Sequence, residues 1–362
     1  MPSRKPAPGA ERMLELAAAL PSQLRDGFRE GTEQAPPLPA ETRQITVAGM
    51  GGSAIAGDLA LSLTAAESEI DLGVVRTYDL PRPLRAPGWL IAISYSGNTQ
   101  ETLHLYDEAG RRGMPRLAIT SGGELEQRAA RDGVPVLAVP KGGPPRAWVG
   151  YLLGTLLGAL DSAFPNSNAE RLRAAAEAVE SAWPALSAAE GSGAQLAEAV
   201  GSRLPTICAE IPLAGLARRW KTQVEENAKR GATFEVLPEM FHNAVVGWDR
   251  AGLVDRSSRA LLFLEWPGSS LEVGPRQAYL VRLLRDRKIP VLPVRLSARD
   301  SLAAIVEGVA VGDLFSLALA ANDGIDPMPT DAIERMKAAT STPSTPHRRA
   351  HAPSTPRRNR SR

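Results

Sequence analysis

Two loops rich in glycine and hydroxyl side chains carry the residues of this sequence that are best suited to bind an anion. The first loop, residues 49–53, reads Gly-Met-Gly-Gly-Ser and lies between a predicted strand and a predicted helix. Its glycines let the backbone approach a ligand closely, N–H groups at a helix start favour an anion, and Ser53 adds a hydroxyl donor. The loop also fits the dinucleotide fingerprint G-x-G-x-x-A, with Asp71 near the position of a ribose-binding acid. Taken alone, it leaves phosphate and nucleotide binding open.

The second loop favours a phosphate group. Residues 94–102 follow an apolar run and open a predicted helix, with three hydroxyl side chains around Gly97, namely Ser94, Ser96 and Thr99. Asn98 and Glu101 predict a capping box that fixes the start of the helix. No Walker lysine follows the glycines, which argues against a nucleotide-binding P-loop. A hydroxyl-lined pocket without lysine suits a compact phosphate monoester; the alternative is an ordinary Ser/Gly turn that caps a helix.

Three side chains farther along the chain have the chemistry for proton transfer. Glu226 follows Glu225 on a predicted helix, His242 lies in a turn, and Arg146 lies in a Pro/Gly loop. A carboxylate can move a proton between neighbouring carbons, an imidazole can act as acid and base, and a fixed guanidinium can hold an oxyanion. The alternatives are a solvated helix face for the glutamates and a surface position for the arginine. His104, inside a predicted helix, is expected to be structural or exposed.

These segments resemble one known family. GMGGSAIAGD and ISYSGNTQET resemble the phosphate-binding loops of sugar isomerase (SIS) domains. EENAK followed by PEMFHN resembles the Glu-Asn-x-Lys and Pro-Glu-x-x-His-Asn patterns of the bifunctional phosphoglucose/phosphomannose isomerases, and the likeness covers approximately residues 40–340. The resemblance implies an aldose–ketose isomerase that interconverts glucose 6-phosphate and mannose 6-phosphate with fructose 6-phosphate through an enediolate.

The resemblance also implies a role for each matched residue. Glu226 would move the proton between C1 and C2, and Arg146 would hold the enediolate. His242 and Lys337 would open the sugar ring, while Thr330 is linked to acceptance of the C2 epimer. The phosphate would bind at the two loops through Ser53, Ser94, Ser96, Thr99, Gly51 and Gly52. Glu225 is a departure, because the family usually has a short polar residue at that position.

The family further implies a homodimer in which the histidine reaches the partner's site, and a reaction without a cofactor. No cluster of histidine, cysteine and carboxylate residues at ligand spacing indicates a metal, so we expect a metal-independent enzyme. The main alternative is a sugar-phosphate-binding regulatory protein that lacks turnover. A dehydrogenase is the third reading, because the first loop fits the dinucleotide fingerprint.

The elements that must position these residues alternate between strands and helices, which is typical of doubly wound parallel sheets in the α/β class. The strands of the first unit are predicted at 44–47, 72–76, 89–94, 116–120 and 134–139, and those of the second at 206–209, 233–237, 260–265 and 291–294. We therefore expect two SIS-type domains, at 41–165 and 201–325. The remaining parts are an N-terminal extension (1–40) with one helix over 10–28, connecting helices (166–200), a C-terminal helix (326–340) and a disordered basic tail (341–362).

Composition limits the partners. The tail holds six arginines and no acid, so the other 340 residues carry 36 basic against 40 acidic side chains. The net charge of +2 thus comes from the tail, and we expect no nucleic-acid-binding face on the folded part. A single cysteine, Cys208, fits a reducing compartment. With neither a signal-peptide core nor an uninterrupted apolar span, the chain is expected in the cytoplasm without membrane contact.

Overall fold

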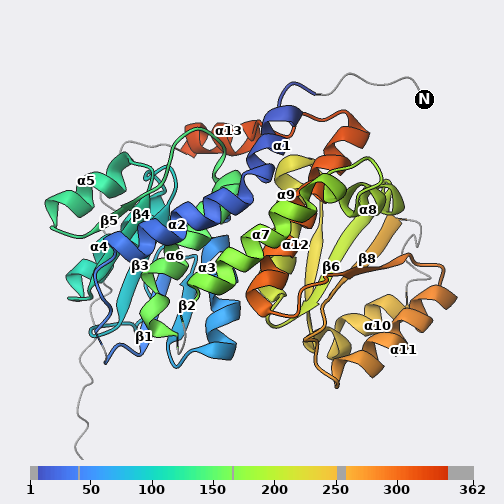
Figure 1. The fold of residues 1–362 in the computed structure, drawn as a ribbon, viewed down its shortest axis with the longest axis horizontal. Helices are drawn as coiled ribbons and strands as arrows, with labels where there is room; N and C mark the ends of the chain where they lie inside the picture. The colour runs from blue at the N-terminus through green and yellow to red at the C-terminus, as the bar shows by residue number, and fades with distance from the viewer. Residues whose placement is uncertain (1–6, 40, 165–166, 251–257, 341–362) are drawn as a thin grey trace, which may run out of the picture. The chain divides into compact units, whose positions relative to one another are not determined.

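The computed structural model describes residues 7–39, 41–164, 167–250 and 258–340 (Figure 1). The chain divides after Met328 into two compact units, and each is described by itself. The larger unit contains both sheets. The smaller one contains helix α13 (Asp331–Thr340). The predicted disordered tail, 341–362, lies outside the described residues.

The first sheet has five parallel strands in the order β2-β1-β3-β4-β5. They are β1 (Gln44–Ala48), β2 (Asp71–Val75), β3 (Trp89–Ser94), β4 (Arg116–Thr120) and β5 (Val136–Ala138). Helices α3 (Gly51–Glu67) and α6 (Val149–Ala159) cover one face, while α4 (Gln100–Arg111) and α5 (Gly123–Arg131) cover the other. Because both faces are covered, every residue of β3 is buried.

The second sheet repeats this plan with four parallel strands in the order β7-β6-β8-β9. They are β6 (Leu204–Glu210), β7 (Thr233–Leu237), β8 (Arg259–Glu265) and β9 (Val291–Arg295). Helices α9 (Ala214–Asn227) and α12 (Ser301–Asp323) pack on one face, and α10 (Ala244–Asp249) and α11 (Val273–Asp286) on the other. Cys208 is fully buried in β6. The predicted α/β class with two doubly wound parallel sheets is confirmed.

Helices α7 (Ala169–Leu186) and α8 (Ser192–Val200) connect the two sheets, and one hydrophobic core runs through both (Figure 1). The contacts between α3 and α9 join the sheets directly. At Gly215, for example, an added Cβ would lie 2.7 Å from the carbonyl oxygen of Asp58. The predicted domain boundaries stay a prediction, because residues 7–328 pack as one unit.

The N-terminal helix predicted over 10–28 is two helices, so that prediction was wrong. α1 (Ala10–Ala18) ends at Ala19, and α2 (Leu20–Gln34) begins directly after it. Pro21 is the physical reason: it has no N–H to donate to the preceding turn, and proline is tolerated only in the first turn of a helix. The apolar residues of the predicted periodicity are buried in both helices except Leu14, which is exposed.

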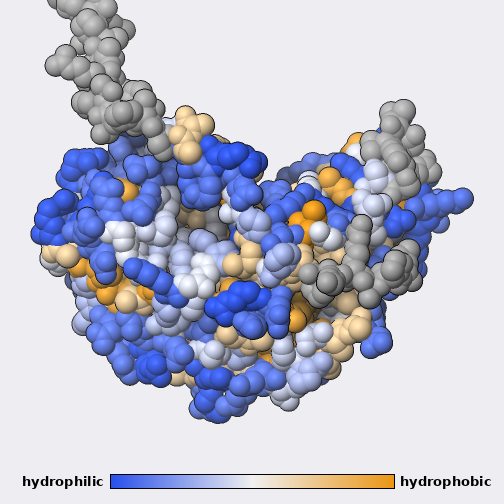
Figure 2. Space-filling model, turned by 90° about the horizontal axis from the view of Figure 1, so that it is seen from above, coloured by the Kyte–Doolittle hydropathy of each residue, from blue (hydrophilic) through white to orange (hydrophobic). Residues whose placement is uncertain are grey.

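α12 is long and apolar enough to pass for a membrane span by composition, but 78% of its apolar window is buried inside the structure, as expected of a core helix. The face shown in Figure 2 is mainly hydrophilic, with hydrophobic residues in small, separate patches. Exposed large hydrophobic residues of the larger unit include Ile211, Val246 and Leu271. Scattered residues of this kind are normal on a folded surface.

Candidate functional site

The first anion-binding candidate lies where the strand order of the first sheet reverses. β2 follows β1 on one side, whereas β3 lies on the other side of β1, and Ala48 pairs with Ala92 across the two strands. The loops after β1 and β3 therefore leave the same edge of the sheet side by side. Ligands of open α/β sheets bind at such a switch point, outside the carboxyl ends of the strands.

The predicted phosphate-binding serines meet at this edge. Ser53, buried in the first turn of α3, accepts a hydrogen bond from the backbone N–H of Tyr95 at 3.2 Å, which ties the two loops together. Ser94, also buried, donates to the Oγ1 of Thr99 at 3.0 Å. Ser96 is exposed, and its Oγ accepts the N–H of Asn98 at 3.3 Å. The four hydroxyls thus lie on two neighbouring loops, one of them in the first turn of α3 and three just before α4.

Gly97 shapes the second loop. Its φ of +69° lies in the left-handed region, and an added Cβ would lie 1.7 Å from the carbonyl oxygen of Gly122. The predicted capping box of Asn98 and Glu101 is wrong. Asn98 turns away from its own helix, and its Oδ1 accepts the N–H of Glu124 at 3.0 Å, at the start of α5. The side chain therefore joins two loops instead of capping α4.

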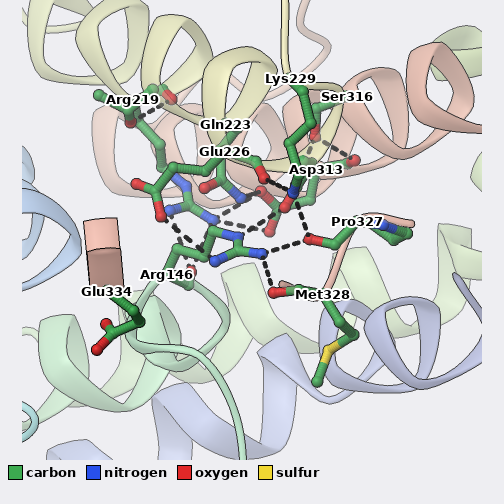
Figure 3. Close-up of polar contacts among 12 residues, drawn as sticks. Arg146, Arg219, Gln223, Glu226, Lys229, Asp313, Ser316, Pro327, Met328 and Glu334 are labelled. Atoms are coloured by element: carbon green, nitrogen blue, oxygen red, sulfur yellow. Dashed lines mark hydrogen bonds and ion pairs between the residues drawn. The ribbon is translucent and has the colours of Figure 1, made fainter. Parts of the chain in front are cut away.

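The candidate catalytic centre lies beside the first loop, around Arg146 (Figure 3). Arg146 belongs to a 3-10 turn, η1 (Pro145–Trp148), and its side chain is 1% exposed. Gly52 lies directly against this turn, because a Cβ added there would be 3.1 Å from the N and Cα atoms of Arg146. The ring of Trp148 stacks on that of Tyr95 at 6.3 Å between centroids. The phosphate loops and the arginine are therefore held together by packing.

The Arg146 guanidinium makes four polar contacts. Its Nε donates to Oδ1 of Asn227 at 2.7 Å, and its Nη1 donates to Oε2 of Glu226 at 3.3 Å. Its Nη2 donates to the carbonyl oxygens of Pro327 and Met328 (Figure 3). Burial lowers the pKa of Arg146, whereas the carboxylates of Glu226 and Asp313 oppose that shift. Arginine remains cationic under such conditions, so Arg146 offers a fixed positive charge.

The segment EENAK supplies partners for this arginine from the end of α9. Glu226 keeps 25% of its side chain exposed, so its carboxylate can reach a ligand as well as Arg146. Lys229 lies just after the helix, with a φ of +56°, and its Nζ donates to the carbonyl oxygens of Glu226 and Pro327. Glu225, the departure from the family pattern, pairs with Lys221 at 2.7 Å.

Sequence reasoning missed a second layer beneath Arg146. Arg219, 1% exposed, donates to the backbone carbonyl oxygen of Arg146 at 3.3 and 3.4 Å and binds both carboxylate oxygens of Asp313 at 2.6 and 2.8 Å. Gln223 also donates to Asp313, at 2.6 Å. One signal was available: Asp313 is a lone acid in the apolar stretch 308–320, and buried acids are paired.

His242 does not join the Arg146 group by any hydrogen bond or ion pair among the described residues. This histidine ends the turn η3 (Glu239–His242) after β7, where its own side chain is exposed and that of Met240 is buried. Lys337 and Thr330 belong to the smaller unit. There, Lys337 pairs with Glu334 at 2.9 Å, and the carbonyl oxygen of Thr330 accepts the N–H of Ile333 at the start of α13.

One set of possible metal ligands lies away from this site. The ligand atoms of Asp79, His104 and Glu108 lie within 4.8 Å of one another. Glu108 already accepts hydrogen bonds from the N–H of Leu80 and from Arg112. Its carboxylate therefore has protein partners, and His104 is exposed as expected.

Comparison with known proteins identifies the family. The chain is 33% identical over 294 residues to a bifunctional phosphoglucose/phosphomannose isomerase of Aquifex aeolicus, covering 81% of this chain and 89% of the relative. The chain belongs to the bifunctional phosphoglucose/phosphomannose isomerase family. A second member, from Caldicellulosiruptor bescii, is 29% identical and is matched over 90% of this chain and 98% of its own length. The resemblance inferred from the motifs is thereby confirmed, and so is a sugar-phosphate isomerase activity.

The other comparisons agree with membership of this isomerase family. Residues 189–339 match the family model of the bacterial phospho-glucose isomerase C-terminal SIS domain. In fold, the chain is similar to the C-terminal domain of glucosamine-fructose-6-phosphate aminotransferase from Francisella tularensis, with a TM-score of 0.68 and 14% identity. That match covers 88% of this chain and 98% of the other. At such low identity the likeness shows the fold alone, and it is the fold expected of a SIS-domain isomerase.

Proposed function

We propose that this isomerase interconverts glucose 6-phosphate and mannose 6-phosphate with fructose 6-phosphate; its relatives are named bifunctional phosphoglucose/phosphomannose isomerases. The observation that carries the proposal is the contact between Arg146 and Glu226, 3.3 Å apart, next to a loop of serines and glycines. A carboxylate and a fixed cation beside a phosphate-binding edge are what proton transfer through an enediolate requires.

The phosphate would bind at the carboxyl ends of β1 and β3. Ser53, Ser94, Ser96 and Thr99 supply hydroxyl groups, and the loop glycines Gly51 and Gly52 let the phosphate approach the start of α3. The helix dipole and the backbone N–H groups at this start favour an anion. Because Gly52 touches the Arg146 turn, a sugar held by its phosphate extends toward Arg146 and Glu226.

The proton transfer would follow from the contacts of these two residues. Glu226 removes a proton from C2 of the open aldose and returns it to C1, and the same carboxylate serves the reverse reaction. Negative charge develops on the oxygen of the enediolate during this transfer. The Nη1 group of Arg146 has two N–H bonds and one contact among the described residues, so its second N–H is free to stabilise that oxygen.

Ring opening is assigned to His242 and Lys337, and acceptance of the C2 epimer to Thr330. His242 is exposed on η3, apart from the Arg146 group of its own chain, and this position supports a homodimer in which the histidine serves the partner's site. The buried single thiol, Cys208, supports a cytoplasmic protein. We propose a reaction that needs neither a cofactor nor a metal.

The test is turnover of fructose 6-phosphate by the purified full-length chain, with and without EDTA. We expect both aldose 6-phosphates to form, at the same rate in either buffer. Saturable binding of the three hexose phosphates without turnover would contradict the proposal and favour a regulatory sugar-phosphate-binding protein. Protection against thermal unfolding by NAD would instead revive the dehydrogenase reading.

The epimer assignment has its own test. Thr330→Ala should lower kcat/KM for mannose 6-phosphate by more than it lowers kcat/KM for glucose 6-phosphate, since the two substrates differ only at C2. Thr32→Ala, on the exposed side of α2, is the matched loss of a threonine hydroxyl and should change neither value. An equal loss on both substrates would contradict the role of Thr330.

A further inference from the structure

We propose that Arg219, held by Asp313, is a positioning residue for Arg146, an inference that rests on the proposed function. Arg219 does not contact the phosphate loops or Glu226 through any hydrogen bond in the described residues. Its guanidinium instead bridges two partners: the backbone carbonyl oxygen of Arg146 and the carboxylate of Asp313 (Figure 3). Through the first contact it fixes the turn that carries the enediolate-binding arginine.

The geometry explains why the turn needs such a support. η1 has only four residues, and a 3-10 turn of this length has few hydrogen bonds of its own. Its neighbour Ala147 is held by Gln23, whose Nε2 donates to the carbonyl oxygen at 3.0 Å. The carbonyl oxygen of Arg146 is held by Arg219 alone among the described side chains. Removing that bond frees the backbone from which the catalytic guanidinium extends.

Asp313 fixes Arg219 and balances its charge. The carboxylate receives three hydrogen bonds, two from Arg219 and one from Gln223, and its side chain is 10% exposed. The same turn of α12 also reaches Arg146 by a second path. Ser316 donates to the carbonyl oxygen of Asp313, and its Oγ accepts a hydrogen bond from Asn227, which binds Nε of Arg146. One turn of α12 thus supports both the backbone and the side chain of Arg146.

The charges of two buried guanidinium groups, those of Arg146 and Arg219, are therefore balanced by two carboxylates, those of Glu226 and Asp313. The guanidinium of Arg219 is one of the charges that face Arg146, and the two cations repel each other. Asp313 offsets that repulsion, so Glu226 is not required as a permanent counter-ion and can serve as a base. Loss of the Asp313 charge should leave Arg146 misplaced and drawn toward Glu226, while the phosphate loops stay as they are.

The test compares two conservative variants, one on α9 and one on α12, with a matched arginine-to-lysine control on α7. Arg219→Lys and Asp313→Asn should each lower kcat for fructose 6-phosphate on the order of 10- to 100-fold, because a small misplacement of a catalytic group is costly. KM should stay within about 3-fold, since phosphate binding is untouched. Arg171→Lys is the control. Arg171 pairs with Asp300 at the start of α12 and with Glu67 at the end of α3, so its loss should lower the melting temperature without lowering kcat.

A second readout separates positioning from stability. Binding of 5-phosphoarabinonohydroxamate, which mimics the enediolate, should weaken by the same factor as kcat in both variants, whereas binding of inorganic phosphate should not change. Kinetics of Arg219→Lys and Asp313→Asn that match wild type would overturn the inference, as would equal weakening of both ligands. Arg146→Lys distinguishes the two levels of the account: if this variant also keeps full activity, the role of Arg146 in catalysis fails, whereas absence of turnover in the wild-type chain would contradict the proposed function itself.

Discussion

The two sheets have the same strand order but opposite chemistry at their carboxyl ends. β6 occupies the place of β1 and β8 that of β3, so the loops after β6 and β8 correspond to the two phosphate loops. In the first sheet a hydroxyl, Ser53, ties the loops together. In the second sheet a carboxylate does so: Glu210 accepts the N–H of Ser270 at 2.9 Å and its hydroxyl at 2.7 Å.

This difference shows how one architecture serves two purposes. Glu210 is 7% exposed and places a negative charge where the first sheet would receive a phosphate. Ser270 already donates its N–H and its hydroxyl to Glu210. An anion would therefore be repelled by the carboxylate and could not use these two donors. The second sheet contributes instead through α9 and α12, which hold Arg146, Glu226 and Asp313 together. In the proposed reaction, the first sheet binds the phosphate, while the helices of the second sheet carry Glu226 and support Arg146.

The largest decrease in the free energy of unfolding is expected from a substitution that disturbs the loop after β3 in the first sheet. Gly97→Ala should lower the free energy of unfolding by about 3 kcal/mol, because it adds both left-handed strain and a clash with Gly122. KM for fructose 6-phosphate should also rise. Gly113→Ala is the control, since its φ of +68° is similar and an added Cβ meets nothing within 4 Å. That variant should lose about 1 kcal/mol and keep its KM. Equal losses in urea unfolding would show that the contact with Gly122 is unimportant.

A smaller effect is expected when one hydroxyl is removed from the first sheet. Ser94→Ala should raise KM on the order of 10-fold, as expected for loss of one hydrogen bond to a charged group. Ser62→Ala, a buried serine of α3 that donates to the carbonyl oxygen of Asp58, should leave KM unchanged. Steady-state kinetics test this prediction, and an unchanged KM for Ser94→Ala would show that this serine does not bind the phosphate.

The smallest catalytic effect is expected at the second sheet. Glu210→Gln weakens the contacts to Ser270, so the free energy of unfolding should fall by about 1 kcal/mol. KM for fructose 6-phosphate should stay within about 2-fold, because this end of the sheet binds no phosphate in our account. A large rise in KM would mean that the carboxyl end of the second sheet also takes part in phosphate binding.

The sequence predicted much of the fold because its parallel strands are short apolar runs separated by helices. All nine predicted strands are present, and β3, β4 and β7 have the predicted bounds. The positions of the two glycine- and hydroxyl-rich loops could be predicted because each follows an apolar strand and precedes a helix, whereas phosphate binding by these loops stays a prediction. The break at Ala19 was missed because apolar periodicity continues across it and only Pro21 marks the change.

The rest of the site was not readable from local patterns. Arg219, Gln223 and Asp313 make contacts across about 90 residues of chain, and each residue type is usual on a helix surface. Their pairing depends on how α9 packs against α12, which no single segment encodes. Asn98 was misjudged for the same reason, since its partner, Glu124, belongs to another helix.

The most direct test of the account is the exchange of substrate hydrogen with solvent. Wild-type enzyme in D2O should incorporate deuterium into fructose 6-phosphate at C1 and into the aldoses at C2, as measured by NMR. Glu226→Gln should lose this exchange on the order of 100- to 10,000-fold, the range expected when a general base is removed. Glu225→Gln, which alters only the pair with Lys221, should exchange like wild type. Exchange at the wild-type rate in Glu226→Gln would contradict the central claim.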